Sequence, residues 1–231
     1  LGYDAIQLIQ DDAPFLVDSV MGDLAAAGVS VRAMFHPLIE VGRDKAGARV
    51  EAQTRESMIL VMVDTLPPER RTAVAASLAE TLADVRAAVA DHGRMTGLMQ
   101  RCLDDLSSQA PEIDPEALEE NRAFLKWLNA DHFVFLGARE YEFPRTQDGA
   151  YEAEAPLSQS GEGLGVLRDP ERRVLRRASE PAVLTKQMKR QLNLGEPVSV
   201  AKANLRSRVH RRAYMDYVGV KRYGADGKAA G

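Results

Sequence analysis

Residues 57–63 (SMILVMV) place the strongest limit on how this chain can fold. An apolar run of this length between polar neighbours is typical of a strand at the centre of a sheet. We therefore interpret residues 57–63 as a central strand of one domain. No apolar run reaches about 18 residues, so a membrane-spanning helix and a membrane partner are not expected.

The segments around this strand suggest an alternating order of elements. Strands are expected at residues 2–10, 30–41 and 84–89, and helices at residues 12–27 and 67–82. Gly28 is placed to end the first helix, Pro37 marks a bend or an edge in the second strand, and the polar residues 43–55 form a turn or loose hairpin. Residues 84–89 could also continue the second helix, but we favour a strand. The resulting β-α-β-β-α-β order predicts a ferredoxin-like domain over residues 1–90.

The remaining residues predict a helical connector followed by a second module. Helices are expected at residues 91–108 and 114–130, the second with Asp114 as N-cap and Pro115 in its first turn. After them the apolar period changes to two, with strands expected at 132–143, 166–167, 174–175, 198–202 and 214–223, a turn at Asp148-Gly149, a flexible loop at 156–165 and a short helix at 184–192. We therefore predict a connector over residues 91–131 and an α+β antiparallel-sheet module over residues 132–231, truncated at its C-terminus.

Charge divides the chain unevenly. The chain has 231 residues and a net charge of −4, but residues 1–167 carry −14 and residues 168–231 carry +10. Such an asymmetry predicts surfaces that attract each other within the chain or its assembly. A nucleic-acid surface is the alternative, although no fold motif of that class accompanies the basic residues.

No convincing catalytic or metal-binding set is present. The glycines of GEGLG at residues 161–165 lack the strand before and helix after that a dinucleotide site requires. The four histidines have no metal-ligand spacing, and the only cysteine, Cys102, lies on the apolar face of its helix. We expect a buried, unreactive thiol, no metal and, since one cysteine suits a reducing compartment, a cytoplasmic protein.

The stretch DDAPFLVDS at residues 11–19 joins the first strand to the first helix. Asp12 is a candidate N-cap, and Asp18 lies near the positive end of the helix dipole, so capping explains both acids. The alternative is a pocket in which backbone donors receive a carboxylate and the acids receive an ammonium group, as a zwitterionic amino acid requires. The candidate effector-binding residues are Asp12, Pro14, Phe15, Asp18 and Ser19.

A second candidate site lies in the basic stretch near residue 210. Arginine suits bidentate contacts with carboxylate or phosphate. A solvated pair of basic strands packed on an acidic neighbour is the interpretation that we favour, and an interface or anion-binding site is the alternative. The candidate interface or anion-binding residues are Arg206, Arg208, His210, Arg211, Arg212 and Asp216.

Six phrases, taken together and in this order, resemble the N-terminal region of the large bacterial NAD-specific glutamate dehydrogenases. They are DDAPFLVDSVMGDL, VRAMFHPLIEVGRD, ADVRAAVAD, FLKWLNADHFVFLGAREYEF, GLGVLRDP and VHRRAYMDYVGVKRYGADGK. The resemblance implies an ACT-like first domain and further ACT-like or PAS-like modules. It also implies a parent enzyme that oxidises L-glutamate to 2-oxoglutarate and ammonia with NAD, whose catalytic lysine and nucleotide-binding domain lie beyond residue 231.

The resemblance predicts a fragment without catalytic or cofactor-binding residues of its own, NAD being used only by the parent enzyme. We expect a regulatory and assembly region whose partners are the rest of the parent enzyme and its other subunits in a homo-oligomer, with an amino acid as effector. A purely structural oligomerisation module is the alternative. A nucleic-acid-binding module that uses residues 206–222 is the less favoured one.

Overall fold

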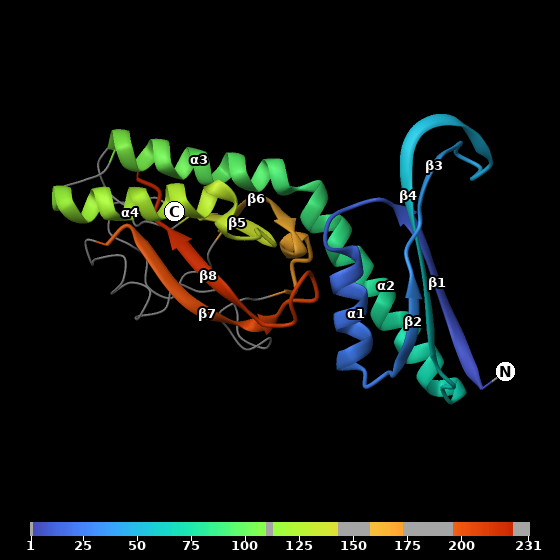
Figure 1. The fold of residues 1–231 in the computed structure, drawn as a ribbon. Coiled ribbons are helices and arrows are strands. Elements are labelled where there is room, and N and C mark those ends of the chain that lie inside the picture. The colour runs from blue at the N-terminus through green and yellow to red at the C-terminus, as the bar shows by residue number, and fades with distance from the viewer. Residues whose placement is uncertain (1, 110–112, 143–157, 173–195, 224–231) are drawn as a thin grey trace. The chain divides into compact units, whose positions relative to one another are not determined.

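The computed structural model describes residues 2–109, 113–142, 158–172 and 196–223 (Figure 1). The chain divides into two compact units, and each is described by itself. The first consists of residues 1–89 together with residues 207–213, and the second consists of residues 90–206 and 214–231. The first unit is therefore completed by a short segment from far along the chain.

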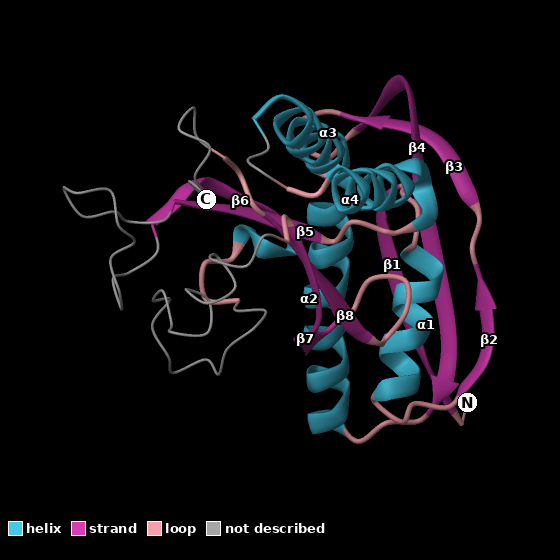
Figure 2. Cartoon of the chain, turned by 90° about the vertical axis from the view of Figure 1, so that its left-hand side faces the viewer, coloured by secondary structure: helices cyan, strands magenta, loops and turns pink. Residues whose placement is uncertain are grey.

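The first unit is an antiparallel sheet with two helices. Its elements are β1 (Tyr3–Asp11), α1 (Leu16–Ala26), β2 (Val31–Phe35), β3 (Leu38–Arg43), β4 (Arg49–Asp64) and α2 (Pro68–Ala90). The strand order is β1-β4-β2, and β3 pairs with the same long strand β4. The predicted central strand at 57–63 is confirmed as part of β4. Helices α1 and α2 lie on one face of the sheet (Figure 2).

The core of the first unit lies between this sheet face and the two helices. The fully buried side chains include Leu16, Val20, Leu24, Ile59, Val61, Val63, Leu78 and Val85. Alternate residues of β4 point the other way, and there Met58, Leu60 and Met62 are only partly buried. Only one face of the apolar run at 57–63 therefore packs against the helices.

Residues 84–89 are helical, so the predicted fourth strand is wrong. Helix α2 continues without a break to Ala90. Val85 and Ala88 are buried at 0% and 4% exposure and extend the face begun by Leu78 and Leu82. Alanine-rich sequence favours the helix, and burial of this face adds to that preference. The first unit thus has the order β-α-β-β-β-α.

The region from residue 30 to residue 55 differs from expectation in two ways. The strand predicted over 30–41 is split at His36 and Pro37, because proline has no N–H to donate to a sheet. Most of the polar stretch 43–55 is strand, since β4 begins at Arg49. Only the turn between β3 and β4 is irregular, and there the Asp44 carboxylate accepts bonds from the N–H groups of Ala46 and Ala48, both at 2.9 Å.

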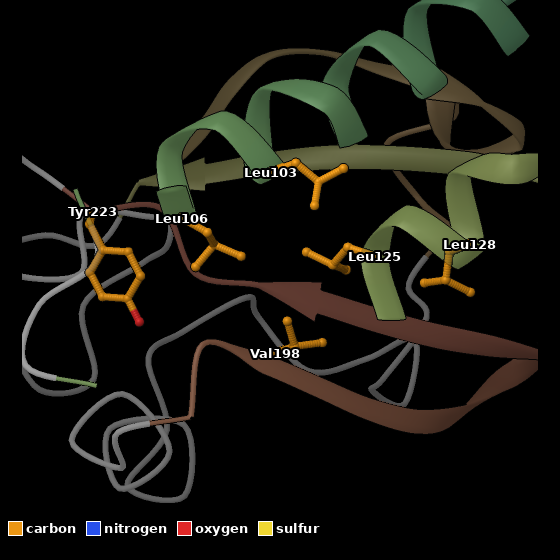
Figure 3. Close-up of a cluster of buried hydrophobic side chains, with 6 residues drawn as sticks. All are labelled: Leu103, Leu106, Leu125, Leu128, Val198 and Tyr223. Atoms are coloured by element: carbon orange, nitrogen blue, oxygen red, sulfur yellow. The ribbon is translucent and has the colours of Figure 1, made fainter. Parts of the chain in front are cut away.

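The described residues of the second unit form two α-helices and two small sheets. Its elements are α3 (His92–Gln109), α4 (Pro115–Trp127), the π-helical turn η1 (Leu128–His132), β5 (Gly137–Glu142), β6 (Ser158–Gly165), the 3₁₀ turn η2 (Val166–Arg168), β7 (Val198–Arg206) and β8 (Tyr214–Val220). Strand β5 pairs with β6 and β7 with β8, both antiparallel. A buried cluster of Leu103, Leu106, Leu125, Leu128, Val198 and Tyr223 joins both helices to the β7 strand (Figure 3).

Several predictions for the second unit can be compared with the structure. Asp114 is confirmed as an N-cap, since its carboxylate accepts a 3.0 Å bond from the N–H of Ala117. The loop predicted at 156–165 is strand β6 over its described part, and the strand predicted at 166–167 is a 3₁₀ turn. The predictions for Asp148-Gly149, 174–175 and 184–192 lie outside the described residues. Whether the module is ACT-like or PAS-like stays a prediction.

Candidate functional site

The start of α1 has an unusual backbone. Phe15 occupies the N-cap position with φ of 69°, and no side chain caps the helix there. A positive φ in an aromatic residue is sparsely populated and costs about 1–3 kcal/mol, so surrounding contacts must hold it. One of them is Ser19, whose hydroxyl donates a 2.6 Å hydrogen bond back to the carbonyl oxygen of Phe15.

The segment 207–213 packs against this helix start, within the first unit. The backbone N–H of His210 donates a 2.9 Å hydrogen bond to the Ser19 hydroxyl, which is 1% exposed as a residue. The His210 imidazole Nδ1 lies 3.0 Å from the Asp18 carboxylate, and its ring centroid lies 5.2 Å from that of Phe15. His210 also has a positive φ, of 61°. Two strained residues therefore meet at one buried serine.

Two arginines of the same segment pair with acids on the helices. The Arg212 guanidinium bonds the carboxylate of Asp23, a residue with only 2% of its surface exposed. The Ser77 hydroxyl of α2 donates a second bond to the same Asp23 oxygen, at 2.9 Å. Arg208 pairs with Glu80 of α2. Burial lowers the pKa of the Arg212 guanidinium, but a group of such high ordinary pKa keeps its charge.

Asp12 is not the N-cap of α1, so the capping interpretation is wrong for this residue. The helix starts four residues later, and the Asp12 carboxylate instead accepts a 2.7 Å hydrogen bond from the Ser57 hydroxyl of β4. His36 Nε2 lies 3.0 Å from the same hydroxyl. Because the only Ser57 proton is directed at Asp12, His36 donates to Ser57 rather than accepting from it. These three residues form a hydrogen-bonded chain at the sheet. Because the Ser57 hydroxyl donates to Asp12 and not to His36, the histidine cannot activate it as a nucleophile in this arrangement. Asp18 is confirmed in the first turn of α1.

The two candidate sets are therefore brought together only in part. Asp18, Ser19 and Phe15 contact His210, whereas Pro14 and Arg211 are exposed. Two members of the basic set, Arg206 and Asp216, lie in the second unit. The Arg206 guanidinium stacks over the Tyr214 ring at 4.9 Å, and Asp216 pairs with Lys202 at 2.5 Å across β7 and β8.

The GEGLG stretch has a structural explanation within the second unit. A Cβ on Gly163 or Gly165 would lie 1.9 Å from the Leu167 carbonyl oxygen or 2.1 Å from the Leu136 carbonyl oxygen. The Asp91 carboxylate accepts a 2.7 Å bond from the Gly165 N–H and two bonds from the Arg168 guanidinium, at 2.6 and 2.8 Å. These bonds hold the pKa of the Asp91 carboxyl well below its usual range. Here the glycines allow close backbone packing.

No reactive side chain stands out in the described part of the chain. The pKa of the Cys102 thiol is raised to about 11, chiefly by burial and then by the charge of Asp105, so at neutral pH it is a protonated, weak nucleophile. Groups of three or more His, Cys, Asp or Glu that could hold a metal ion do not occur among the described residues. The described helices include none long and apolar enough to cross a membrane. The contacts at the start of α1 hold the segment 207–213.

Sequence reasoning missed the acid that anchors the segment. Asp23 lies seven residues after Leu16 and next to Leu24, so it falls on the apolar face of α1. An acid on a buried face requires a cationic or hydrogen-bonding partner, and that signal was available. The identity of the partner was not available, because Arg212 is 189 residues away in the chain.

The sequence of this chain is similar to one known protein family. Residues 2–78 match the family model described as glutamate dehydrogenase, ACT1 domain. The chain is 32% identical over 237 residues to an NAD-specific glutamate dehydrogenase of Halomonas elongata, and 30% identical over 238 residues to one of Pseudomonas aeruginosa. Each alignment covers 98% of this chain, which spans only 14% of the length of either relative.

The first unit of the structure contains the whole matched range and has the sheet and paired helices described above. The alignments run on through the second unit. Residues 2–78 therefore form a glutamate dehydrogenase ACT1 domain, and the chain is a distant homologue of the N-terminal part of the NAD-specific glutamate dehydrogenases.

Proposed function

We propose that this chain is a non-catalytic regulatory and assembly region of an NAD-dependent glutamate dehydrogenase. The parent enzyme would convert L-glutamate, NAD and water to 2-oxoglutarate, ammonia and NADH, with the catalytic residues and the NAD site elsewhere in the polypeptide. The observation that carries the proposal is the bond between Ser19 of the ACT1 domain and His210. It links the helix start to a segment that joins β7 to β8.

The ligand at this helix start would be an amino acid. Asp18 is 59% exposed, so its carboxylate can receive an ammonium group. The N–H groups of the first turn can receive the ligand carboxylate, because a helix leaves these donors without intrahelical partners. The ligand would compete with His210 for Asp18 and Ser19. Binding would then loosen residues 207–213, and the change would pass to β7 and β8 through the chain.

The test is thermal unfolding of the 231-residue chain against the twenty amino acids, 2-oxoglutarate, NAD and NADH. A ligand at a hundredfold excess over its dissociation constant stabilises the folded state by about 2.7 kcal/mol. We expect a selective shift with one or two amino acids, and loss of that shift in Asp18→Ala. The control is Glu51→Gln, an exposed acid on β4. A cooperative sample that responds to no amino acid would end the sensing proposal.

The basic segment offers little support for nucleic-acid binding. Arg208, His210 and Arg212 face carboxylates of their own unit, and Arg222 pairs with Glu140 at 2.8 Å. Charges already paired in this way release fewer counterions from a phosphate backbone. Filter binding with duplex DNA and single-stranded RNA at low salt checks this directly, and we expect no retention.

A further inference from the structure

Strand β1 lies at the edge of the sheet in the first unit. It pairs with β4 on one side, and the described residues supply no strand on its other side. A strand at 84–89 could have added a fifth strand to this sheet, but those residues belong to α2. The row of peptide groups along the outer edge of β1 is thus left to another partner or to water.

This edge has few of the features that normally discourage strand pairing. Strand β1 (YDAIQLIQD) makes nine consecutive pairs with β4 without a shift of register, and it contains no proline, glycine or basic residue. Its two charged residues, Asp4 and Asp11, lie toward its ends. The opposite edge is interrupted, because β2 and β3 are separated at Pro37 and each has a shifted register. Exposed edges are usually blunted by bulges, prolines or charged side chains. The β2–β3 edge is interrupted and carries a proline, whereas the edge of β1 is continuous and has only the charges of Asp4 and Asp11.

The side chains of β1 also indicate a missing neighbour. Ile59 and Val61 of β4 are 2% and 0% exposed. Leu8 and Ile6 stand directly opposite them in the same layer, yet both are only partly buried. A strand beside β1 would place apolar side chains against these two and complete the layer.

The hydrogen-bond pattern shows which residues face the free edge. Asp12 N–H donates a 2.8 Å bond to the Arg55 carbonyl, and this pair continues the register of β1 with β4. In an antiparallel pair, bonded and non-bonded positions alternate. The even-numbered residues of β1 therefore bond to β4. The odd-numbered residues Tyr3, Ala5, Gln7, Ile9 and Asp11 direct their N–H and C=O groups outward.

We propose that β1 pairs antiparallel with β1 of a second copy of this chain, with the two-fold axis at Gln7. In this register the outward-facing residues meet each other: Gln7 opposes Gln7, Ala5 opposes Ile9, and Tyr3 opposes Asp11. In the core layer Ile6 opposes Leu8. No acid faces an acid, since Asp4 meets Gln10. This self-complementarity favours a second copy over an unrelated strand, and two-fold dimers are the commonest symmetric assemblies.

This inference rests on the assembly part of the proposed function and is independent of amino-acid sensing. Sedimentation velocity of the 231-residue chain without any ligand is therefore the measurement. We expect a concentration-dependent dimer. A chain that stays monomeric over the whole accessible concentration range would overturn the proposal, whatever the amino acids do in the thermal test.

Charge exchange at Gln7 tests the register. Gln7 is exposed, so Gln7→Lys and Gln7→Glu should leave each monomer folded. Either variant alone places like charges directly opposite each other and should weaken the dimer by about fivefold. An equimolar mixture should restore association, because Lys then opposes Glu. The matched control is Ala25→Lys, exposed on α1. Single variants that dimerise as tightly as the parent would refute the pairing, and so would a mixture that stays dissociated.

Removal of an edge donor gives an independent check. Gln7→Pro deletes an N–H that does not bond to β4, so the monomer should keep its far-ultraviolet circular dichroism. The dimer would lose two equivalent bonds and should weaken about tenfold or more. An unchanged dimer in a folded Gln7→Pro sample would assign association to another surface, such as a strand supplied by some other part of the chain.

Discussion

Each unit of this protein holds a distant segment with one buried aspartate, but the two aspartates do so differently. Asp23 in the first unit is 2% exposed and pairs with Arg212, whose side chain is 28% exposed. Asp91 in the second unit is 1% exposed and pairs with Arg168, whose side chain is 51% exposed. In the first pair both charges are largely removed from water. In the second pair the cation remains half solvated.

The remaining partners also differ. Asp23 takes a hydroxyl bond from Ser77, so its contacts come entirely from side chains. Asp91 takes the backbone N–H of Gly165 as well as Arg168. Desolvating two charges costs several kcal/mol each, and a carboxylate left without its cation loses the compensation. The segment 207–213 is therefore held to the first unit by the Asp23 side chain. The bonds of Asp91, by contrast, also depend on the backbone conformation at Gly165.

The backbone dependence of the second unit gives the largest expected effect. Gly165→Ala would place a Cβ 2.1 Å from the Leu136 carbonyl oxygen, at a φ of 58°. Overpacking and backbone strain together should cost about 4 kcal/mol. The measurement is urea unfolding followed by fluorescence of Trp127, the only tryptophan, which lies in the second unit. If the midpoint is unchanged, the turn is not as closely packed as described.

Breaking the buried ion pair of the first unit should have the next largest effect. Arg212→Met keeps most of the apolar stem but leaves the Asp23 carboxylate without its cation. We expect a loss of about 3 kcal/mol in the unfolding free energy of the first unit, measured by circular dichroism in urea. Arg211→Met is the control, because Arg211 is exposed. Equal effects of the two substitutions would contradict the role of Asp23.

The half-solvated pair of the second unit should cost less to break. Asp91→Asn preserves shape and the carbonyl-type acceptor but removes the charge opposite Arg168, for an expected loss of about 2 kcal/mol at pH 7. The pKa of Asp91 is lowered from 3.8, mainly by the hydrogen bond from Arg168. Its contribution to stability is thus present above pH 4 and is lost as the pH falls below that value.

Asp91→Asn should also change how the stability of the chain depends on pH in acid. The unsubstituted chain should lose stability as the pH falls from about 4 toward 2, because unfolding then allows Asp91 to bind a proton. The Asn variant lacks this group, so its Trp127-monitored midpoint should change less over that range. If the unsubstituted chain and the Asn variant show the same pH dependence, Asp91 is not the group whose protonation lowers the stability.

The smallest effect should have the opposite sign. Gly22 lies inside α1, and a Cβ there would meet the Arg212 side chain at 3.6 Å, an ordinary contact distance. Gly22→Ala should therefore stabilise the first unit by about 0.5–1 kcal/mol, because glycine in a helix interior loses more backbone freedom. A destabilised variant would mean that Arg212 packs more closely than the contact distance indicates.

Local signals explain why much of the fold was predictable. The period-four apolar face at Leu16, Val20 and Leu24, the Asp114-Pro115 helix start and the run at 57–63 each depend on residues close together in sequence. The wrong predictions concern segments whose local sequence fits a strand and a helix about equally. Residues 84–89 fit a strand or a helix by pattern, and burial of Val85 and Ala88 along α2 decided for the helix.

The sequence by itself determined the strands and helices with strong periodicity, and residues recognisable as part of a glutamate dehydrogenase ACT1 domain. The tertiary structure decided the rest: that Asp12 accepts a hydrogen bond from Ser57 instead of capping α1, that His210 contacts Ser19, and that no strand of the described residues pairs with the outer edge of β1. The physical reason is the same in each case. Hydrogen bonds and ion pairs join whichever polar groups the packed chain brings close, and sequence separation carries no information about that distance.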